Sequence, residues 1–75
     1  LQLQLQQKMD KKQIGIQIKT RRRELNIDQS TLAALAGVGI NTLVAIERGN
    51  GNPRLDTIIS VADTLGLQLI LTLKG

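Results

Sequence analysis

One central stretch, residues 29–48, limits the folds open to this chain more than any other part. Its small and apolar residues recur at helical spacing on both sides of Gly37, with Ala33 four residues before that glycine. A methyl side chain at Ala33 lets two helix backbones approach closely, and glycine reaches left-handed backbone angles that other residues resist. Leu43 and Ile46 lie three residues apart, on one face of the next helix. The spacing predicts two short helices that cross through a tight turn.

Two helices with this spacing are typical of the helix-turn-helix, whose second helix enters the major groove of DNA. Leu32, Ala36 and Val38 are expected to complete the buried contact between the helices. An ordinary helical hairpin uses the same packing without touching nucleic acid. The spacing alone leaves that alternative open.

The size and composition of the chain exclude several classes of protein. Its 75 residues hold one small core of marginal stability, so oligomerisation is expected to contribute. With no cysteine and no histidine, the chain cannot form a disulfide and lacks the usual zinc ligands and proton-transfer groups. Its serine and lysine residues form no recognisable catalytic arrangement. The sequence therefore predicts no enzyme, no metal site and no cofactor.

Composition also narrows the choice of partner and compartment. Because the chain shows no membrane-length apolar run and no secretory leader, we expect a cytoplasmic protein that does not bind membranes. The absence of Phe, Tyr and Trp argues against reading single strands by base stacking, which leaves duplex DNA as the better nucleic-acid partner.

The net charge of +4 is unevenly spread. Seven basic residues fall in a segment where only Asp10 opposes them: Lys8, Lys11, Lys12, Lys19, Arg21, Arg22 and Arg23. Such a segment could neutralise phosphates, in a manner that weakens with salt. The alternative is a solvated helix face that keeps the protein soluble.

Turn and cap signals divide the chain into four expected helices. The first covers residues 11–24 and ends near Asn26, and Asp28 caps a second helix over residues 29–36. A third covers residues 40–48 and is closed by Gly49. A fourth ends at Gly66. Apolar faces are expected on the first helix, from Ile14, Ile18 and Leu25, and on the fourth, from Leu55, Ile58, Ile59, Ala62 and Leu65.

Near both ends of the chain, apolar residues recur at every second position, as they do in β-strands. Residues 67–73 predict a strand that has no partner in a helical domain, so its backbone must pair with a second copy or with the leader. Pairing between two chains is the simplest solution, through Leu67, Leu69, Leu71 and Leu73. The leader, residues 1–9, is either a strand or a non-native segment, since Met9 offers a start. We thus expect a domain over residues 10–66 and a dimerisation strand over residues 67–75.

Residues 14–67 resemble the Cro/cI-type helix-turn-helix domain, also called the XRE family. The motifs that carry the resemblance are Ile-Asp-Gln-Ser-Thr-Leu-Ala (27–33), Ala-Gly-Val (36–38), Thr-Leu (42–43), Ile-Glu-Arg-Gly (46–49) and Asn-Pro-Arg-Leu-Asp-Thr-Ile (52–58). The resemblance implies a mainly α fold, a lambda-repressor-like bundle of four helices followed by a C-terminal strand. The short chain, its Gly-Asn-Pro loop and that strand look most like the HipB-like antitoxins of type II toxin-antitoxin systems.

The resemblance also assigns residues to roles. Gln29, with Ser30, would meet a DNA phosphate at the start of the second helix, and Arg54 would lie near phosphates or the minor groove. The basic segment, independently of the resemblance, leads us to expect Arg21 and Arg23 at the DNA backbone. The residues implied for the major groove are Gly39, Ile40, Asn41, Thr42 and Ala45. Arg22 and Glu47 match a structural pair that ties the first helix to the third.

This chain departs from the family where the third helix starts. Gly39 offers no capping hydroxyl, and Ile40, Val44 and Ala45 make the reading surface unusually apolar. Discrimination between sequences would then rest on Asn41, Thr42 and DNA shape.

The function so implied is that of a homodimeric repressor of a palindromic operator, an antitoxin whose toxin would be a HipA-like kinase. The alternatives are a stand-alone phage-like repressor and a protein-interaction adaptor that no longer reads DNA.

Overall fold

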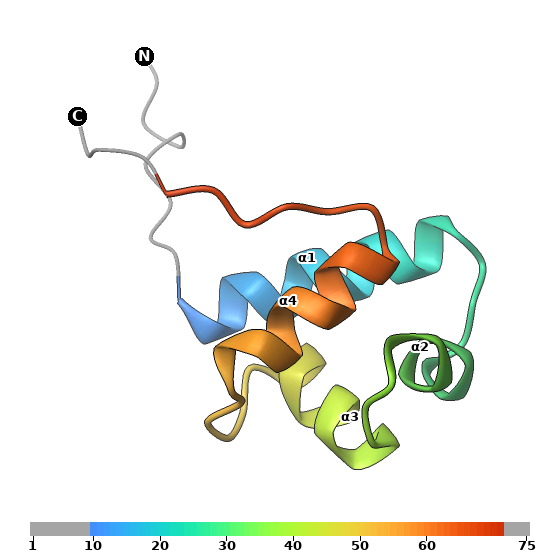
Figure 1. The fold of residues 1–75 in the computed structure, drawn as a ribbon, viewed down its shortest axis with the longest axis horizontal. Helices are drawn as coiled ribbons and strands as arrows, with labels where there is room; N and C mark the ends of the chain where they lie inside the picture. Colours follow the sequence, from blue (N-terminus) through green and yellow to red (C-terminus); the bar gives the residue numbers. More distant parts are fainter. Residues whose placement is uncertain (1–9, 72–75) are drawn as a thin grey trace.

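The computed structural model describes residues 10–71 of the chain (Figure 1). These residues form four α-helices: α1 (Lys11–Glu24), α2 (Gln29–Ala36), α3 (Ile40–Arg48) and α4 (Leu55–Thr64). The mainly helical fold and the expected order of helices are confirmed. The leader, 1–9, and residues 72–75, which include Leu73 of the expected strand, lie outside the described part of the chain.

Local chemistry sets where the helices begin and end. One carboxylate oxygen of Asp28 accepts a hydrogen bond from the Thr31 amide at 2.8 Å, which satisfies a free donor in the first turn of α2. Asn26 has φ 58°, so the chain leaves α1 through a left-handed residue. Gly37 closes α2 with φ 71°, a conformation that a side chain would strain. The cap signals in the sequence were therefore interpreted correctly.

The core lies where the helices converge. α1 packs on α3, and α2 packs on both α3 and α4. The buried apolar residues are Ile18, Leu32, Ala33, Leu43, Ile46, Ile58, Val61, Ala62 and Leu65.

Three residues expected on apolar faces are exposed instead. Leu55 is 67% exposed, Ile59 41% and Leu25 41%. Along α4, the fully buried Val61 lies inside the arc that faces the core, whereas Leu55 and Ile59 fall at its edge. Leu25 follows the last residue of α1 and lies beyond its contact with the core.

The contact between α1 and α3 depends on a glycine that the sequence interpretation did not single out. A Cβ atom added at Gly15 would press on the carbonyl oxygen of Ile46 and lie 2.8 Å from that of Glu47. The two backbones thus touch at this point. The close approach brings the second half of α1 within reach of α3.

The described part of the tail, residues 67–71, runs back along α4 and α1 (Figure 1). The Leu67 amide donates to the Ala62 carbonyl at 2.8 Å, which turns the chain out of α4. Within residues 10–71 the single chain contains no strand. The expected pairing of this strand, with a second copy or with the leader, remains a prediction.

Candidate nucleic-acid interface

The interface is organised by the bend between α2 and α3. The two helices meet at 112°, within the range of roughly 90–120° that describes a helix-turn-helix. No single helix among residues 10–71 has the length and apolar character needed to cross a membrane. The pair α2 and α3 passes that test only when taken together, across this bend.

α3 has two faces of different character. Leu43, Ile46 and Glu47 are buried against the other helices. On the outer side, Asn41 and Thr42 are exposed in the first turn, and Ala45 is half-buried one turn further on. These three line a depression of about 340 Å³ that is bounded by the loop of residues 50–53. The helix therefore presents two hydrogen-bonding side chains to solvent at its amino end.

The amino end of α3 has no side-chain cap. Gly39 occupies the N-cap position with φ −70°, and no side chain accepts a hydrogen bond from the first turn. The nearest atom that a Cβ at Gly39 would meet is the Thr42 hydroxyl oxygen, 3.8 Å away. Because the first amides of a helix carry partial positive charge, this open end can receive an anion such as a phosphate.

A buried ion pair fixes α3 from the inside. The Arg22 guanidinium donates to both carboxylate oxygens of Glu47, at 2.7 and 3.0 Å, and to the Ile27 carbonyl at 2.9 Å. The Gln29 amide nitrogen donates to Glu47 at 3.0 Å. One carboxylate thus links α1, α2 and α3. The pairing that the resemblance implied for Arg22 and Glu47 is present in the structure.

The protonation of this pair follows from its contacts. Burial raises the pKa of Glu47, but hydrogen bonds from Arg22 and Gln29 outweigh that effect and hold the pKa below its ordinary value. The hydrogen bond to Glu47 raises the pKa of Arg22. Both groups are therefore charged near neutral pH, and the bidentate geometry compensates for their removal from water.

Comparison with known proteins agrees with this geometry. A family model described as helix-turn-helix matches residues 18–71, which is most of the chain and includes α2, α3 and their turn. The chain belongs to the Cro/cI-type (XRE) helix-turn-helix family. It is 32% identical over 62 residues to an uncharacterized HTH-type transcriptional regulator, y4mF, of Sinorhizobium fredii, and the match covers 83% of this chain and 82% of that protein.

In this helix-turn-helix protein, the residues expected at phosphates lie in different surroundings. Ser30 is exposed in the first turn of α2, whereas Gln29 is half-buried and its amide nitrogen is held by Glu47. Arg23 is exposed on α1. The side chain of Arg54 is 82% exposed, and its contact with Asp56 at 3.4 Å is a surface pair of little strength.

Arg21 binds the end of α4 and a neighbouring residue of α1. Its Nε donates to the Leu65 carbonyl at 3.0 Å, and Nη1 lies 3.3 Å from the Glu24 carboxylate. The guanidinium thus satisfies the carboxyl end of α4. Sequence spacing could not reveal this contact, because it joins residues far apart in the chain.

A lysine that received no individual role in the sequence interpretation lies beside the loop after α3. The Lys11 ammonium donates to the Gly51 carbonyl at 2.6 Å. This contact places a positive charge near the depression lined by Asn41 and Thr42. The basic character of the first helix was a signal for such a residue, but it did not identify which lysine.

Proposed function

We propose that this chain is a transcriptional regulator that binds double-stranded DNA in a sequence-specific manner, with α3 in the major groove. The exposure of Asn41 and Thr42 in the first turn of α3 carries this proposal, since the opposite face of the same helix is buried. A helix whose inner face is fixed by packing can present its outer side chains in a defined geometry. Membership of the family and the printed name of the Sinorhizobium relative support a regulatory role.

Each exposed group on α3 has a matching group on DNA. The amide of Asn41 can pair with adenine through two hydrogen bonds, and Thr42 can meet a base or a phosphate. Ile40 and Ala45 can contact thymine methyl groups. The open amino end of α3 and the exposed Ser30 are suited to phosphate oxygens.

The positive charges around α3 support the same assignment. Arg54 is an exposed cation beside the turn between α2 and α3, and Lys11 lies beside the 50–53 loop. Arg23 is exposed on α1, and its phosphate contact is proposed from the basic character of that segment. Basic side chains at the edge of a reading helix neutralise phosphates and set its register on the duplex. Arg21 is left out of this set because it binds the end of α4. The side-chain amide of Gln29 already donates to Glu47, so Gln29 could contact a phosphate only through its remaining N–H.

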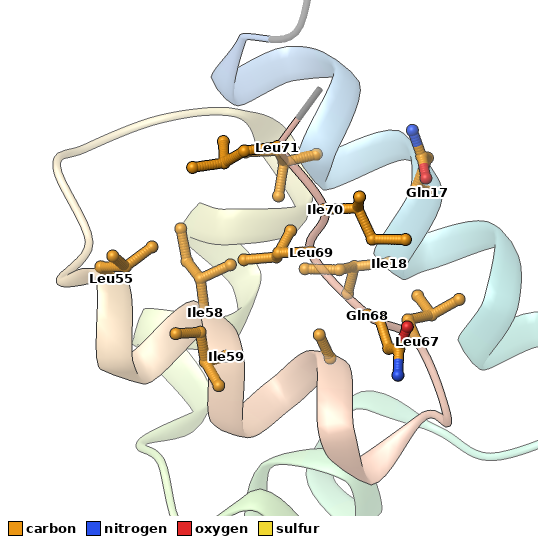
Figure 2. Close-up of a pocket in the computed structure, with 12 residues that line it drawn as sticks. Gln17, Ile18, Leu55, Ile58, Ile59, Leu67, Gln68, Leu69, Ile70 and Leu71 are labelled. Carbon is orange, nitrogen blue, oxygen red and sulfur yellow. The ribbon is translucent and has the colours of Figure 1, made fainter. Parts of the chain in front are cut away.

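We also propose that the protein acts as a homodimer joined through the tail. A groove of about 430 Å³ lies between α1, α4 and the tail, and Figure 2 shows its aliphatic lining, which includes Leu55, Ile58, Leu69, Ile70 and Leu71. Leu71 is 100% exposed in the single chain, and Ile70 is 70% exposed. Covering these side chains with the residue 67–73 strand of a second copy would remove apolar surface from water and pair the strand backbones.

The proposed dimer contact lies away from α3. In Figure 1 the tail passes along one side of α1 and α4, and α3 lies on the other side. Two copies joined through their tails would therefore leave both reading helices free. Dimers of this class read half-sites about 34 Å apart on one face of the duplex, which favours a palindromic operator.

The finer role that we propose is repression of the protein's own operon as an antitoxin. It rests on the resemblance of the short chain, its Gly-Asn-Pro loop and its tail to HipB-like antitoxins, whose toxin partner would be a HipA-like kinase. A stand-alone repressor would share every feature of the DNA surface and would differ in having no toxin partner.

The proposed function is tested by selecting bound sequences from random duplex DNA with the full chain. We expect a palindrome with half-sites about one helical turn apart. Asn41→Ala should lose preference at one base position of each half-site. Thr20→Ala, an exposed polar residue on α1, serves as the control and should retain the motif. Selection of no motif by folded protein would favour the adaptor alternative.

The dimer is tested by placing a charge in the tail. Leu71→Lys should shift the population toward monomers in sedimentation experiments, because the lysine would have to be buried against the second chain. Thr20→Lys adds the same charge at an exposed position on α1 that does not line the groove, and this control should dimerise as the wild type does. Dimerisation of the Leu71→Lys protein at the wild-type concentration would refute the tail contact.

A further inference from the structure

The loop after α3 contains an asparagine followed by a glycine. Asn50 and Gly51 are both exposed, and apart from the two chain neighbours of Gly51 no atom lies within 4 Å of the position that a Cβ would take there. The Asn50 amide donates to the Ala45 carbonyl at 2.9 Å, which anchors the residue at the end of α3. Within residues 10–71, the Gly51 nitrogen donates no hydrogen bond. The side-chain amide of Asn50 therefore has an unshielded backbone nitrogen as its neighbour.

We propose that Asn50 is a site of spontaneous deamidation and that the product binds DNA more weakly than the original chain. The second half of this inference rests on the proposed function. In the first step, a solvent base removes the proton from the Gly51 nitrogen, which attacks the Cγ carbon of Asn50. The N–Cγ bond closes a five-membered succinimide, and the side-chain nitrogen leaves as ammonia with protons from solvent.

Water then opens the ring in one of two places. Cleavage between the Gly51 nitrogen and Cγ gives aspartate in a normal backbone. Cleavage between that nitrogen and the main-chain carbonyl carbon gives isoaspartate, whose backbone continues through Cγ and is one carbon longer. Each product is asparagine plus water minus ammonia, so no oxidant, metal or cofactor is consumed.

Neighbouring asparagines provide a comparison within the same molecule. Asn52 lies in the same exposed loop, but it is followed by Pro53, whose nitrogen has no proton to lose. Asn26 is followed by Ile27, a branched residue whose nitrogen already donates to the Arg22 carbonyl at 3.3 Å. The environments of Asn52 and Asn26 thus oppose the attack that is open at Asn50.

The location of Asn50 links the modification to DNA binding. Asn50 lines the same depression as Asn41 and Thr42. Deamidation lowers the net charge of +4 by one and puts a carboxylate where phosphates would approach. It also places that carboxylate near Lys11, which is bound to the next residue, and would draw this cation away from phosphate. We expect about a tenfold loss of affinity for a dimer modified in both chains.

The experiment uses the full chain, incubated in mildly alkaline buffer and mapped by peptide mass spectrometry. We expect aspartate and isoaspartate to accumulate at Asn50 while Asn52 stays unmodified. Affinity for the selected operator is then measured for Asn50→Asp, which copies one product, and for Asn50→Gln, which keeps a neutral amide and cannot readily form the five-membered ring. Circular dichroism of both variants checks that they fold.

The outcomes separate the two proposals. Weaker binding by Asn50→Asp than by Asn50→Gln, together with modification at Asn50, supports the inference. If Asn50 remains as intact as Asn52, or if both variants bind the operator equally well, the inference is wrong while the proposed function stands. Modification at Asn50 in a chain that binds no duplex DNA would instead refute the proposed function and, with it, the effect on affinity.

Discussion

Replacing Gly15 by alanine tests how closely α1 approaches α3. The added methyl group would meet the backbone carbonyls of Ile46 and Glu47, the second at 2.8 Å. Overpacking of a core costs roughly 1–3 kcal/mol, and the upper end applies because a helix backbone cannot rotate aside as a side chain can. Alanine regains about 1 kcal/mol of helix propensity at an interior position. The net loss in the free energy of unfolding is therefore about 2 kcal/mol.

The assay is thermal unfolding followed by circular dichroism. For a domain of this size, a loss of about 2 kcal/mol lowers the melting temperature by roughly 8–16 °C. Gly37→Ala is the matched control, since nothing lies within 4 Å of a Cβ there and only the φ of 71° opposes the substitution. It should cost about 1 kcal/mol. A Gly15→Ala protein that melts at or above the wild-type temperature would show that the helices do not touch.

The remaining predictions concern the cap of α3, the buried pair and the basic face of α1. Gly39→Ser should raise the free energy of unfolding in urea by about 0.5 kcal/mol by supplying the missing cap, and a similar gain for Gly39→Ala would argue against that cause. Glu47→Gln should cost about 3 kcal/mol because it leaves Arg22 buried and unpaired, and equal stability of the two proteins would contradict this. Since folding lowers the pKa of Glu47, its contribution is complete above the ordinary value of 4.5 and is lost as pH falls, so the variant should show a shallower acid limb in unfolding measured against pH. Arg23→Ala should weaken operator binding equally across sequences and reduce the salt slope by about one, whereas Arg21→Ala should lower stability and leave that slope unchanged; a slope change in Arg21→Ala alone would reverse their assignments.

Helix boundaries could be predicted from the sequence because their causes are local. Asp28 caps the helix that begins at the next residue, and Gly37 ends it four residues after Ala33. Asn26 adopts its left-handed conformation within the same short connection. Each of these effects involves residues only a few positions apart, so the sequence carries the whole signal.

Contacts between distant segments were beyond the reach of the same reasoning. Gly15 matters only because α3 lies against it, and nothing near position 15 in the sequence indicates that neighbour. The helical period of α4 identified its apolar residues but did not show that Val61, rather than Ile59, lies at the centre of the buried face. Arg21 was grouped with its basic neighbours although it binds the Leu65 carbonyl.

The candidate site could likewise be predicted in part from the sequence. The exposure of Asn41 and Thr42 follows from helical periodicity once Leu43 and Ile46 are assigned to the core. The inward hydrogen bond of Gln29 to Glu47 was not foreseen, because it depends on how α2 crosses α3. The contact of Lys11 with Gly51 was not foreseen either, because the two residues are far apart in the sequence.

The division of α3 into two faces has a consequence for how such a protein can change over generations. Among residues 10–71, the side-chain hydrogen bonds that tie α3 to other helices come from its inner side, where Glu47 is bound by Arg22 and Gln29. On the outer side, Asn41 and Thr42 donate no side-chain hydrogen bond to the described part of the chain. Substitutions at these two positions should therefore change the free energy of unfolding only a little. A duplicated copy of the gene could acquire a new target sequence while its scaffold stays intact.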